Sequence, residues 1–266
     1  MSLDYSNPLL SMAPPNKEEL TFYLNVYQDA DELEICLKQL RQVYRNSRLV
    51  IRSDGDPDPK IDSIAKAYGG DCHYGERLMG IEKGGLIVHE MLRLFLTDPT
   101  PYLLKIDPDT RIFRPFKALP KFSCVFGTAQ RQGELFSIQG GCLGMTLEVA
   151  KRWYAADFFL DPAFAERPPP WVITPLLRNR PIDLGLTSID WLVGWACKNL
   201  ATQLVDWPEI LSEWKVTPEN EDLRYAVTHP HKPRDISTKD SDRCALRYWE
   251  GVSSITGHSL LSEDVV

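Results

Sequence analysis

The sequence has no apolar run long enough to cross a membrane as a helix. Such a span needs roughly 20 consecutive, mostly apolar residues. The best candidate, residues 84–96, is interrupted by His89, Glu90 and Arg93. The N-terminal residues also lack the basic start of a secretory signal peptide. We therefore expect no transmembrane segment and a cytoplasmic location.

Basic residues are not in excess. The 266 residues include 30 Lys and Arg against 37 Asp and Glu, so the formal net charge is -7. A nucleic-acid-binding protein normally presents a basic surface, and a polybasic membrane anchor needs clustered Lys and Arg. We therefore expect no nucleic-acid partner. With 43% hydrophobic and 25% charged residues, the composition is that of an ordinary globular protein.

Cysteine pairs and several well-known motifs are also missing. None of the six cysteines forms a C-x-x-C pair or a zinc-type cluster with histidine, so we interpret them as small buried residues. There is no G-x-G-x-x-G after the first expected strand, no Walker A loop and no G-x-S-x-G. These absences argue against dinucleotide-binding, P-loop and α/β-hydrolase enzymes.

The apolar pattern of the first 110 residues alternates between strands and helices. Alternation of this kind predicts a parallel sheet with helices on its faces. In the second half the pattern predicts strands, two short helices and a loop rich in proline and arginine. The expected strands are 20–27, 48–52, 102–106, 122–126, 136–145, 201–207 and 225–229; the expected helices begin near residues 29, 57, 83, 146 and 188; the loop is 161–182.

Carboxylates follow three of the first expected strands, at Asp29, Asp54 and the pair Asp107 and Asp109. Ligands of open α/β sheets bind outside the carboxyl ends of the strands, so three acidic strand ends indicate a shared site. The chain has D-x-D spacing five times, but only the 107/109 pair directly follows a short apolar strand. Such a pair is typical of Mg²⁺ or Mn²⁺ sites completed by phosphate oxygens. The alternative is a polar turn that caps the strand.

The order of these segments resembles that of glycosyltransferases with the GT-A fold. The resemblance runs from residue 20 to about 231 and rests on IRSDGD, YLLKIDPDT, SIQGG and a late histidine. It implies a Rossmann-like mixed sheet, mainly parallel, with helices on both faces. No internal repeat, low-complexity segment or linker divides the sequence, so we also expect one domain over residues 1–266. The parts expected are a leader at 1–18, a nucleotide-binding half at 20–115, an acceptor half at 120–234 and a tail at 235–266.

The resemblance implies a nucleoside-diphosphate-sugar donor and places residues around it. By this likeness, Tyr27, Gln28 and Asp29 lie near the base and the ribose. Asp54 contacts the base, and Lys83 approaches the donor. These five residues form the expected donor side of the site.

The same resemblance implies a divalent ion, Mn²⁺ or Mg²⁺, at the end of the third strand. Asp107 and Asp109 would coordinate the ion and the donor diphosphate, with His229 as the third ligand. His231 is an alternative to His229, and Lys232 would meet the diphosphate as a point charge. The segment HPHKPR lacks the glycine spacing usual in retaining families, and an exposed polar loop is the alternative.

Two further features point to the acceptor side. Gly140 and Gly141 permit close approach to an acceptor, or simply a bulge in a strand. Asp190 begins an expected helix, where inverting members of the family place a general base. The alternative is an acid that suits the helix dipole after a Ser188 cap. The late His and Lys point instead to a retaining enzyme, so the sequence leaves the stereochemistry open.

Together these features predict a metal-dependent glycosyltransferase of the hexosyltransferase kind, with an unidentified glycan, lipid or small-molecule acceptor. One alternative is an inactive module that binds a nucleotide or a glycan. A second is a sugar nucleotidyltransferase, although the glycine-rich basic loop of such enzymes is replaced here by Gln28-Asp29-Ala30-Asp31. A third is a metal-dependent phosphohydrolase.

Overall fold

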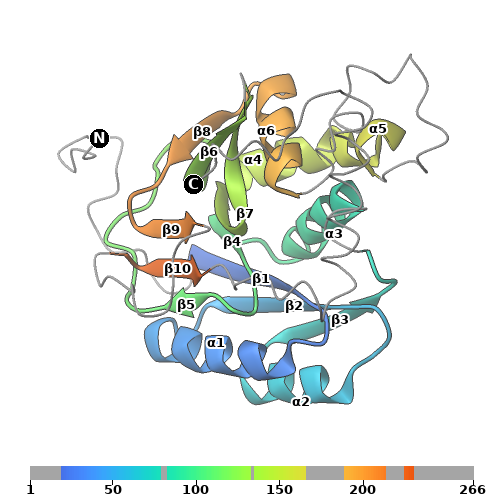
Figure 1. Ribbon diagram of the computed structural model, residues 1–266, viewed down its shortest axis with the longest axis vertical. Helices are drawn as coiled ribbons and strands as arrows, with labels where there is room; N and C mark the ends of the chain where they lie inside the picture. Colours follow the sequence, from blue (N-terminus) through green and yellow to red (C-terminus); the bar gives the residue numbers. More distant parts are fainter. Residues whose placement is uncertain (1–18, 79–82, 133–134, 166–188, 214–224, 231–266) are drawn as a thin grey trace, which may run out of the picture.

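The computed structural model describes residues 19–78, 83–132, 135–165, 189–213 and 225–230. Its main sheet has seven strands in the order β3-β2-β1-β4-β7-β6-β8 (Figure 1). Within it, β7 alone runs against its neighbours β4 and β6, and the other neighbouring pairs are parallel. The predicted mixed, mainly parallel sheet is therefore confirmed. The strands are β1 (Leu20–Val26), β2 (Arg48–Asp54), β3 (Asp71–Gly75), β4 (Tyr102–Ile106), β6 (Cys124–Gln132), β7 (Leu135–Thr146) and β8 (Gln203–Asp206).

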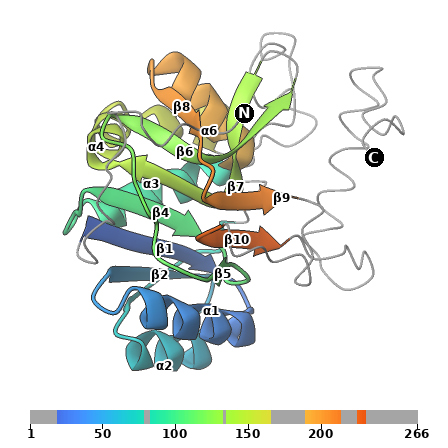
Figure 2. The same ribbon diagram turned by 90° about the vertical axis from the view of Figure 1, so that its left-hand side faces the viewer.

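Helices cover both faces of this sheet, as predicted (Figures 1 and 2). The apolar stripes of α1 and α2 join one buried cluster with residues of β1, β2 and β4. Those of α3, α4 and α6 join a second cluster on the opposite face, with Tyr23, Val50 and Leu103. Burial of these stripes is the main force that holds the layers together. The helices are α1 (Ala30–Val43), α2 (Pro59–Ala67), α3 (Gly84–Phe95), α4 (Leu147–Ala155), α5 (Pro162–Ala165) and α6 (Ile189–Asn199).

Helix α2 shows how local sequence sets these boundaries. Asp58 is its N-cap, and the carboxylate accepts a hydrogen bond from the backbone N of Lys60 at 2.8 Å. Pro59 occupies the first helical position, where its fixed φ fits and no N–H is needed. Gly69 follows the helix with φ +63, a left-handed conformation that glycine adopts without strain. The helix predicted to begin near residue 57 is therefore confirmed.

Some elements were not predicted. Strand β3 has the polar sequence DCHYG and is nowhere fully buried, so it lacks the apolar alternation that identifies a strand. It forms at the edge of the sheet because it pairs with β2 from Val50 to Asp54. The loop predicted over 161–182 is wrong at its start, where α5 forms; residues 166–188 lie outside the described part of the chain.

A second, three-stranded sheet brings a distant segment back to the end of β4. Its order is β5-β10-β9, with β5 (Arg111–Ile112), β10 (Val227–Pro230) and β9 (Ile210–Glu213). Strand β10 pairs with β5 through Thr228 and Arg111, and with β9 through His229 and Ser212 (Figure 2). This pairing carries His229 to the turn after β4.

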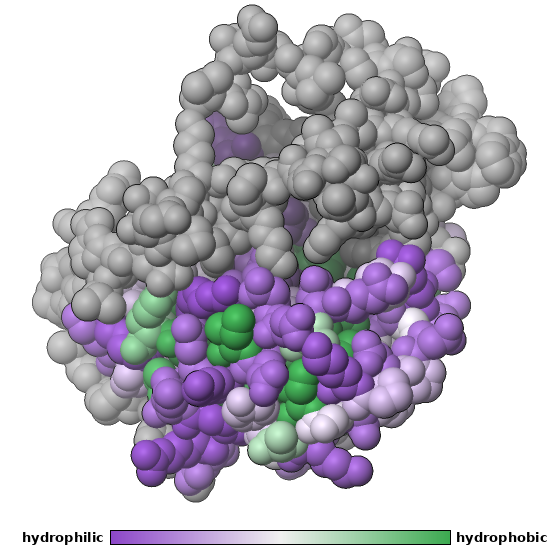
Figure 3. All heavy atoms as spheres, turned by 60° about the horizontal axis from the view of Figure 1, so that its bottom comes forward, coloured by the Kyte–Doolittle hydropathy of each residue, from purple (hydrophilic) through white to green (hydrophobic). Residues whose placement is uncertain are grey.

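The outer surface of α1 and α2 carries no large apolar area. Figure 3 shows this face as mostly hydrophilic, with hydrophobic residues in small separate patches. Ile35 of α1 is 45% exposed. Scattered exposed apolar side chains are normal for a folded protein. In the part of the chain that the structure describes, no helix is both long and apolar enough to span a bilayer.

Candidate metal centre and adjoining pocket

Asp107, Asp109 and His229 meet at the carboxyl end of β4. His229 Nε2 lies 3.4 Å from Asp107 Oδ2 and 3.2 Å from Asp109 Oδ1. One ligand atom from each residue lies within 4.8 Å of the others. Metal–ligand bonds of roughly 2.0–2.6 Å place ligands of one ion no further than about 5 Å apart. Two carboxylates and one imidazole in this spacing fit a divalent ion of the Mn²⁺ or Mg²⁺ class.

The surroundings of His229 favour a positive charge. Burial lowers the pKa of His229, but the hydrogen bond to Asp109 and the charges of Asp107 and Asp109 outweigh it. The pKa of His229 therefore lies above its usual value. The two carboxylates thus favour a positive charge beside His229 Nε2. This charge can be a proton on the imidazole or a metal ion bound in place of that proton.

A chain of hydrogen bonds orients the His229 imidazole through Nδ1, the ring nitrogen that faces away from the carboxylates. Ser212 Oγ donates to Gln139 Oε1 at 3.1 Å and lies 3.2 Å from His229 Nδ1. Because the serine proton is directed to Gln139, the serine oxygen can accept from Nδ1–H. In the neutral, metal-binding form of His229 with its proton on Nδ1, Nε2 carries no proton and faces Asp107 and Asp109. The arrangement is the outer shell that a metal-binding histidine requires.

Lys105 lies behind the same carboxylates. Its side chain is 5% exposed, although it belongs to the apolar strand β4. The Nζ group donates to Asp107 Oδ1 and to the carbonyl oxygen of Gly140. Asp107 therefore has one oxygen bound to Lys105 and the other facing His229.

Gly140 and Gly141 allow β7 to pass directly against two of the candidate residues. The Gly140 amide donates to Asp190 Oδ1, and a Cβ on Gly140 would collide with that carboxylate. A Cβ on Gly141 would collide with the imidazole of His229. The Gly141 carbonyl also accepts from the backbone N of Asp107 at 3.0 Å. The glycine pair thus has a structural cause, which is to let Asp190 and His229 approach the strand.

Asp190 stands in the first turn of α6, as predicted. The residue is half-buried, but its carboxyl group points inward toward Gly140. Burial raises the pKa of Asp190, and the hydrogen bond from Gly140 and the charge of Lys105 only partly oppose this. A carboxyl group with a raised pKa is a better proton acceptor near neutral pH.

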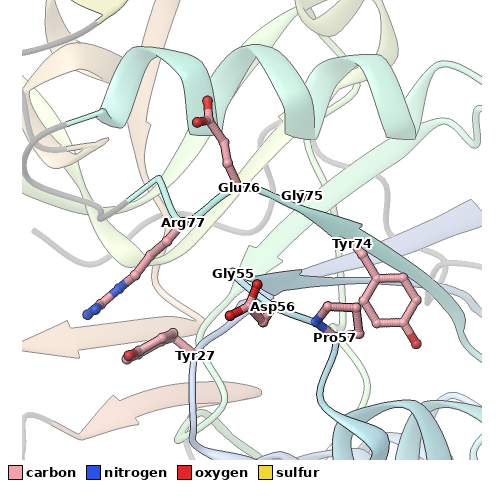
Figure 4. Close-up of a pocket in the computed structure, with 8 residues that line it drawn as sticks. All are labelled: Tyr27, Gly55, Asp56, Pro57, Tyr74, Gly75, Glu76 and Arg77. Atoms are coloured by element: carbon pink, nitrogen blue, oxygen red, sulfur yellow. The ribbon is translucent and has the colours of Figure 1, made fainter.

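An open pocket of about 590 Å³ lies at the carboxyl ends of β1, β2 and β3. Figure 4 shows Tyr27 and Arg77 on one side of it and Tyr74 with Pro57 on the other. The Arg77 guanidinium carbon is 3.6 Å from the centre of the Tyr27 ring. Because β1 lies between β2 and β4, this pocket and the Asp107 turn both lie at the carboxyl ends of the parallel strands.

The remaining donor-side candidates surround this pocket. Asp54 is 4% exposed and forms an ion pair with Arg52, and it also accepts from the Leu78 amide at 2.8 Å. The carboxylate in the pocket lining is Asp56, two residues further on. Lys83 is the N-cap residue of α3 and lies 3.5 Å from Glu76, a lining residue.

Gln28 and Asp29 lead from β1 into α1, next to the pocket. Gln28 has φ +56, a strained conformation for a residue with a side chain, and is exposed. Asp29 is the N-cap residue of α1, and its carbonyl oxygen accepts from Leu33. His231 and Lys232 lie outside the described residues.

Three residues of this region were not predicted. Lys105 carried a visible signal, because a charged residue inside the apolar run YLLKI has to be paired when that strand is buried. Arg77 and Ser212 carried none. Arg77 follows β3 and Ser212 lies in β9, two short strands that were not predicted, and only the pairing of these strands places them.

Comparisons with known proteins give a structural likeness only. No protein-family model matches the sequence, and no curated protein matches it. One similar solved structure is the mannosyltransferase PcManGT from Pyrobaculum calidifontis in complex with GDP-Man and Mn²⁺. It has 12% identity and a TM-score of 0.38 over 53% of this chain and 48% of that one. This chain thus matches about half the length of that protein.

A second similar structure is the galactosyltransferase LgtC in complex with donor and acceptor sugar analogues. It has 12% identity and a TM-score of 0.46, over 92% of this chain and 98% of that one. The structure itself shows the mixed, mainly parallel α/β sheet with helices on both faces that the sequence predicts.

Proposed function

We propose that this chain is a metal-dependent glycosyltransferase that moves a sugar from a nucleoside-diphosphate sugar to an acceptor hydroxyl. The observation that carries the proposal is the meeting of Asp107, Asp109 and His229. Asp109 and His229 are 120 positions apart in the sequence, yet they meet at the carboxyl ends of the strands, where an open pocket also lies. Ligands of open α/β sheets bind at the carboxyl ends of the strands.

Asp107 Oδ2, Asp109 Oδ1 and His229 Nε2 would hold the divalent ion, Mn²⁺ or Mg²⁺. When bound, the ion offsets the charge that develops on the leaving diphosphate as its bond to the sugar breaks. Ser212 holds the imidazole in the matching tautomer, and Lys105 holds the Asp107 carboxylate in position.

The pocket beside the metal centre is the proposed place of the nucleoside. Tyr27 offers an aromatic face, and Gln28 and Asp29 follow it toward the ribose. Asp54 would act there through Leu78 and Arg52, which its carboxylate holds in place. Lys83, beside Glu76, and Lys232 would face the donor as positive charges.

The acceptor would lie beside Asp190, which Gly140 allows to approach β7. Asp190 is the proposed general base, because its carboxyl group has a raised pKa and lies against Gly140. As the acceptor oxygen bonds to the anomeric carbon, its proton passes to Asp190, and the diphosphate leaves with the electrons of the broken bond. In this proposal both halves of the site belong to one domain.

Thermal unfolding with UDP, GDP, CDP and dTDP, each with and without Mn²⁺, tests the proposal. A ligand at a hundred times its Kd should add about 2.7 kcal/mol to the stability of the protein. We expect a metal-dependent rise in Tm with one nucleotide, and sugar transfer from the corresponding donor. No rise with any nucleotide would contradict the proposal.

Other outcomes identify the alternatives. Phosphate release from simple esters without nucleotide preference would indicate a metal-dependent phosphohydrolase. A nucleotide-dependent rise without turnover of any matching sugar nucleotide would indicate a non-catalytic binding module.

Ser212→Ala is expected to weaken Mn²⁺ binding about 10- to 100-fold, the usual effect of removing an outer-shell partner of a metal-binding histidine. The reason is that His229 Nδ1 loses the partner that fixes its tautomer. Isothermal titration with Mn²⁺ in the presence of the nucleotide measures the effect. Ser47→Ala is the matched control, because that buried hydroxyl bonds to Tyr44 at the end of α1. Equal affinity in both variants would rule out this role for Ser212.

A further inference from the structure

Lys105 places a positive charge directly behind the candidate metal ligands. Burying a lysine is costly unless it is paired, and this one has two partners, Asp107 Oδ1 and the carbonyl oxygen of Gly140. Only 5% of its side chain is exposed. The ammonium group is therefore a fixed part of the site and not a mobile surface charge.

This cation changes the charge that an incoming metal ion meets. Asp107 and Asp109 contribute two negative charges, and Lys105 cancels one of them. His229 has to be neutral to bind a metal ion and then contributes no charge. Arg111 donates to the Asp109 carbonyl, but it is paired with Glu32 at 2.9 Å and adds no net charge. Among the described residues, these groups sum to about one negative charge, too little to neutralise a divalent ion.

Lys105 also limits the number of oxygens that the site offers. It occupies Asp107 Oδ1, so Asp107 Oδ2 is the oxygen directed at His229. Asp107 can then serve as a single-oxygen ligand only. Among the described residues, the candidate ligand atoms are one oxygen from Asp107, one from Asp109 and one nitrogen from His229. An ion with six ligands therefore has positions left that diphosphate oxygens can fill.

We propose that Lys105 keeps the intrinsic metal affinity of the site low, so that the ion is held firmly only together with a diphosphate. This inference rests on the proposed function. A diphosphate supplies what the site lacks. It brings negative charge, which replaces the charge that Lys105 cancels, and it brings additional oxygen ligands. Metal and nucleotide then strengthen each other, and by linkage each raises the affinity of the other by the same factor.

The test uses Lys105→Gln, which removes the charge but keeps a hydrogen-bond donor for Gly140. A unit charge within several ångströms of a partly exposed ion changes its affinity by about tenfold or more. We therefore expect Lys105→Gln to bind Mn²⁺ alone at least about tenfold more tightly than the wild type. The nucleotide should raise the Mn²⁺ affinity of the wild type as well. Loss of the free Mn²⁺ signal in electron paramagnetic resonance titrations, with and without UDP, GDP, CDP or dTDP, measures both quantities.

Two further variants and the wild type are compared with Lys105→Gln. Lys105→Arg should keep the weak affinity of the wild type, because it keeps the charge. Lys60→Gln is the matched control, since Lys60 is exposed and paired with Asp31 on the outside of α1 and α2. Unchanged or weaker Mn²⁺ binding by folded Lys105→Gln would overturn the inference. If that variant does not fold, the wild type decides: equal Mn²⁺ affinity with and without the nucleotide also overturns it.

These outcomes separate the inference from the proposed function. Wild-type protein that binds Mn²⁺ tightly without nucleotide, and still transfers sugar, contradicts only the role of Lys105. Wild-type protein that binds no Mn²⁺ with any of the four nucleotides contradicts the proposed function itself.

Discussion

Replacing Asp107 and Asp109 together by asparagine is expected to lower sugar transfer by about a thousandfold or more. The pair supplies two of the three candidate metal ligands among the described residues. A divalent ion contributes several kcal/mol to stabilising a transition state with developing negative charge, and each 1.36 kcal/mol corresponds to about tenfold in rate. The metal-dependent rise in Tm with nucleotide should disappear in the same variant.

Asparagine is a better substitute than alanine here because of Lys105. Its Nζ group is bonded to Asp107 Oδ1, and truncation to alanine would leave a buried cation without this partner. Breaking a buried ion pair in this way costs about 3–5 kcal/mol, so an inactive alanine variant could simply be unfolded. The amide oxygen of asparagine still accepts from Lys105 but carries no charge to hold a metal ion.

The matched control is Asp71→Asn with Asp98→Asn. Asp71 begins β3 and Asp98 precedes β4, so both lie at the amino ends of the parallel strands, away from the candidate site. Both are exposed. This control should keep full activity and the nucleotide response. Activity within tenfold of the wild type in the Asp107 and Asp109 variant would exclude a metal role for the pair.

The part of the fold that sequence predicts is the part with a strong burial pattern. Strands β1, β2 and β4 are almost wholly buried, and their apolar runs identify them without any tertiary information. Strand β3 is polar and lies at the sheet edge, and it exists because β2 offers a free edge to pair with. A pattern of apolar residues cannot reveal an edge strand that is held mainly by backbone hydrogen bonds.

The same contrast applies to the site. Asp107 and Asp109 were identified because they directly follow a recognisable strand. His229 was a candidate from the resemblance to GT-A enzymes, but only the pairing of β10 with β5 and β9 brings it to them. Ser212 has no motif of its own, and its importance comes from a neighbour on an adjacent strand. Contacts between segments of distant sequence are the information that a single sequence lacks.

Asp190→Asn is expected to make the protein more stable to heat at neutral pH and much less active. Folding raises the pKa of Asp190, chiefly through burial, so the unfolded chain releases this proton at a lower pH than the folded protein. Stability therefore falls as the pH rises from the ordinary carboxyl value of about 3.9 through the raised pKa, and it remains lower at pH 7. Asparagine cannot ionise and avoids this loss, and its amide oxygen still accepts from Gly140.

Loss of the general base should lower turnover by about 10²- to 10⁴-fold. Thermal unfolding of wild type and variant from pH 4 to pH 8 should show a gain in Tm that grows with pH and closes near pH 4. Asp206→Asn is the matched control, because that exposed carboxylate also accepts a backbone hydrogen bond, from Ala129 at 2.9 Å. Direct proton transfer to Asp190 predicts inversion at the anomeric carbon. A product with retained configuration, or full activity in Asp190→Asn, would therefore remove Asp190 from the chemistry and leave it as a first-turn acid of α6.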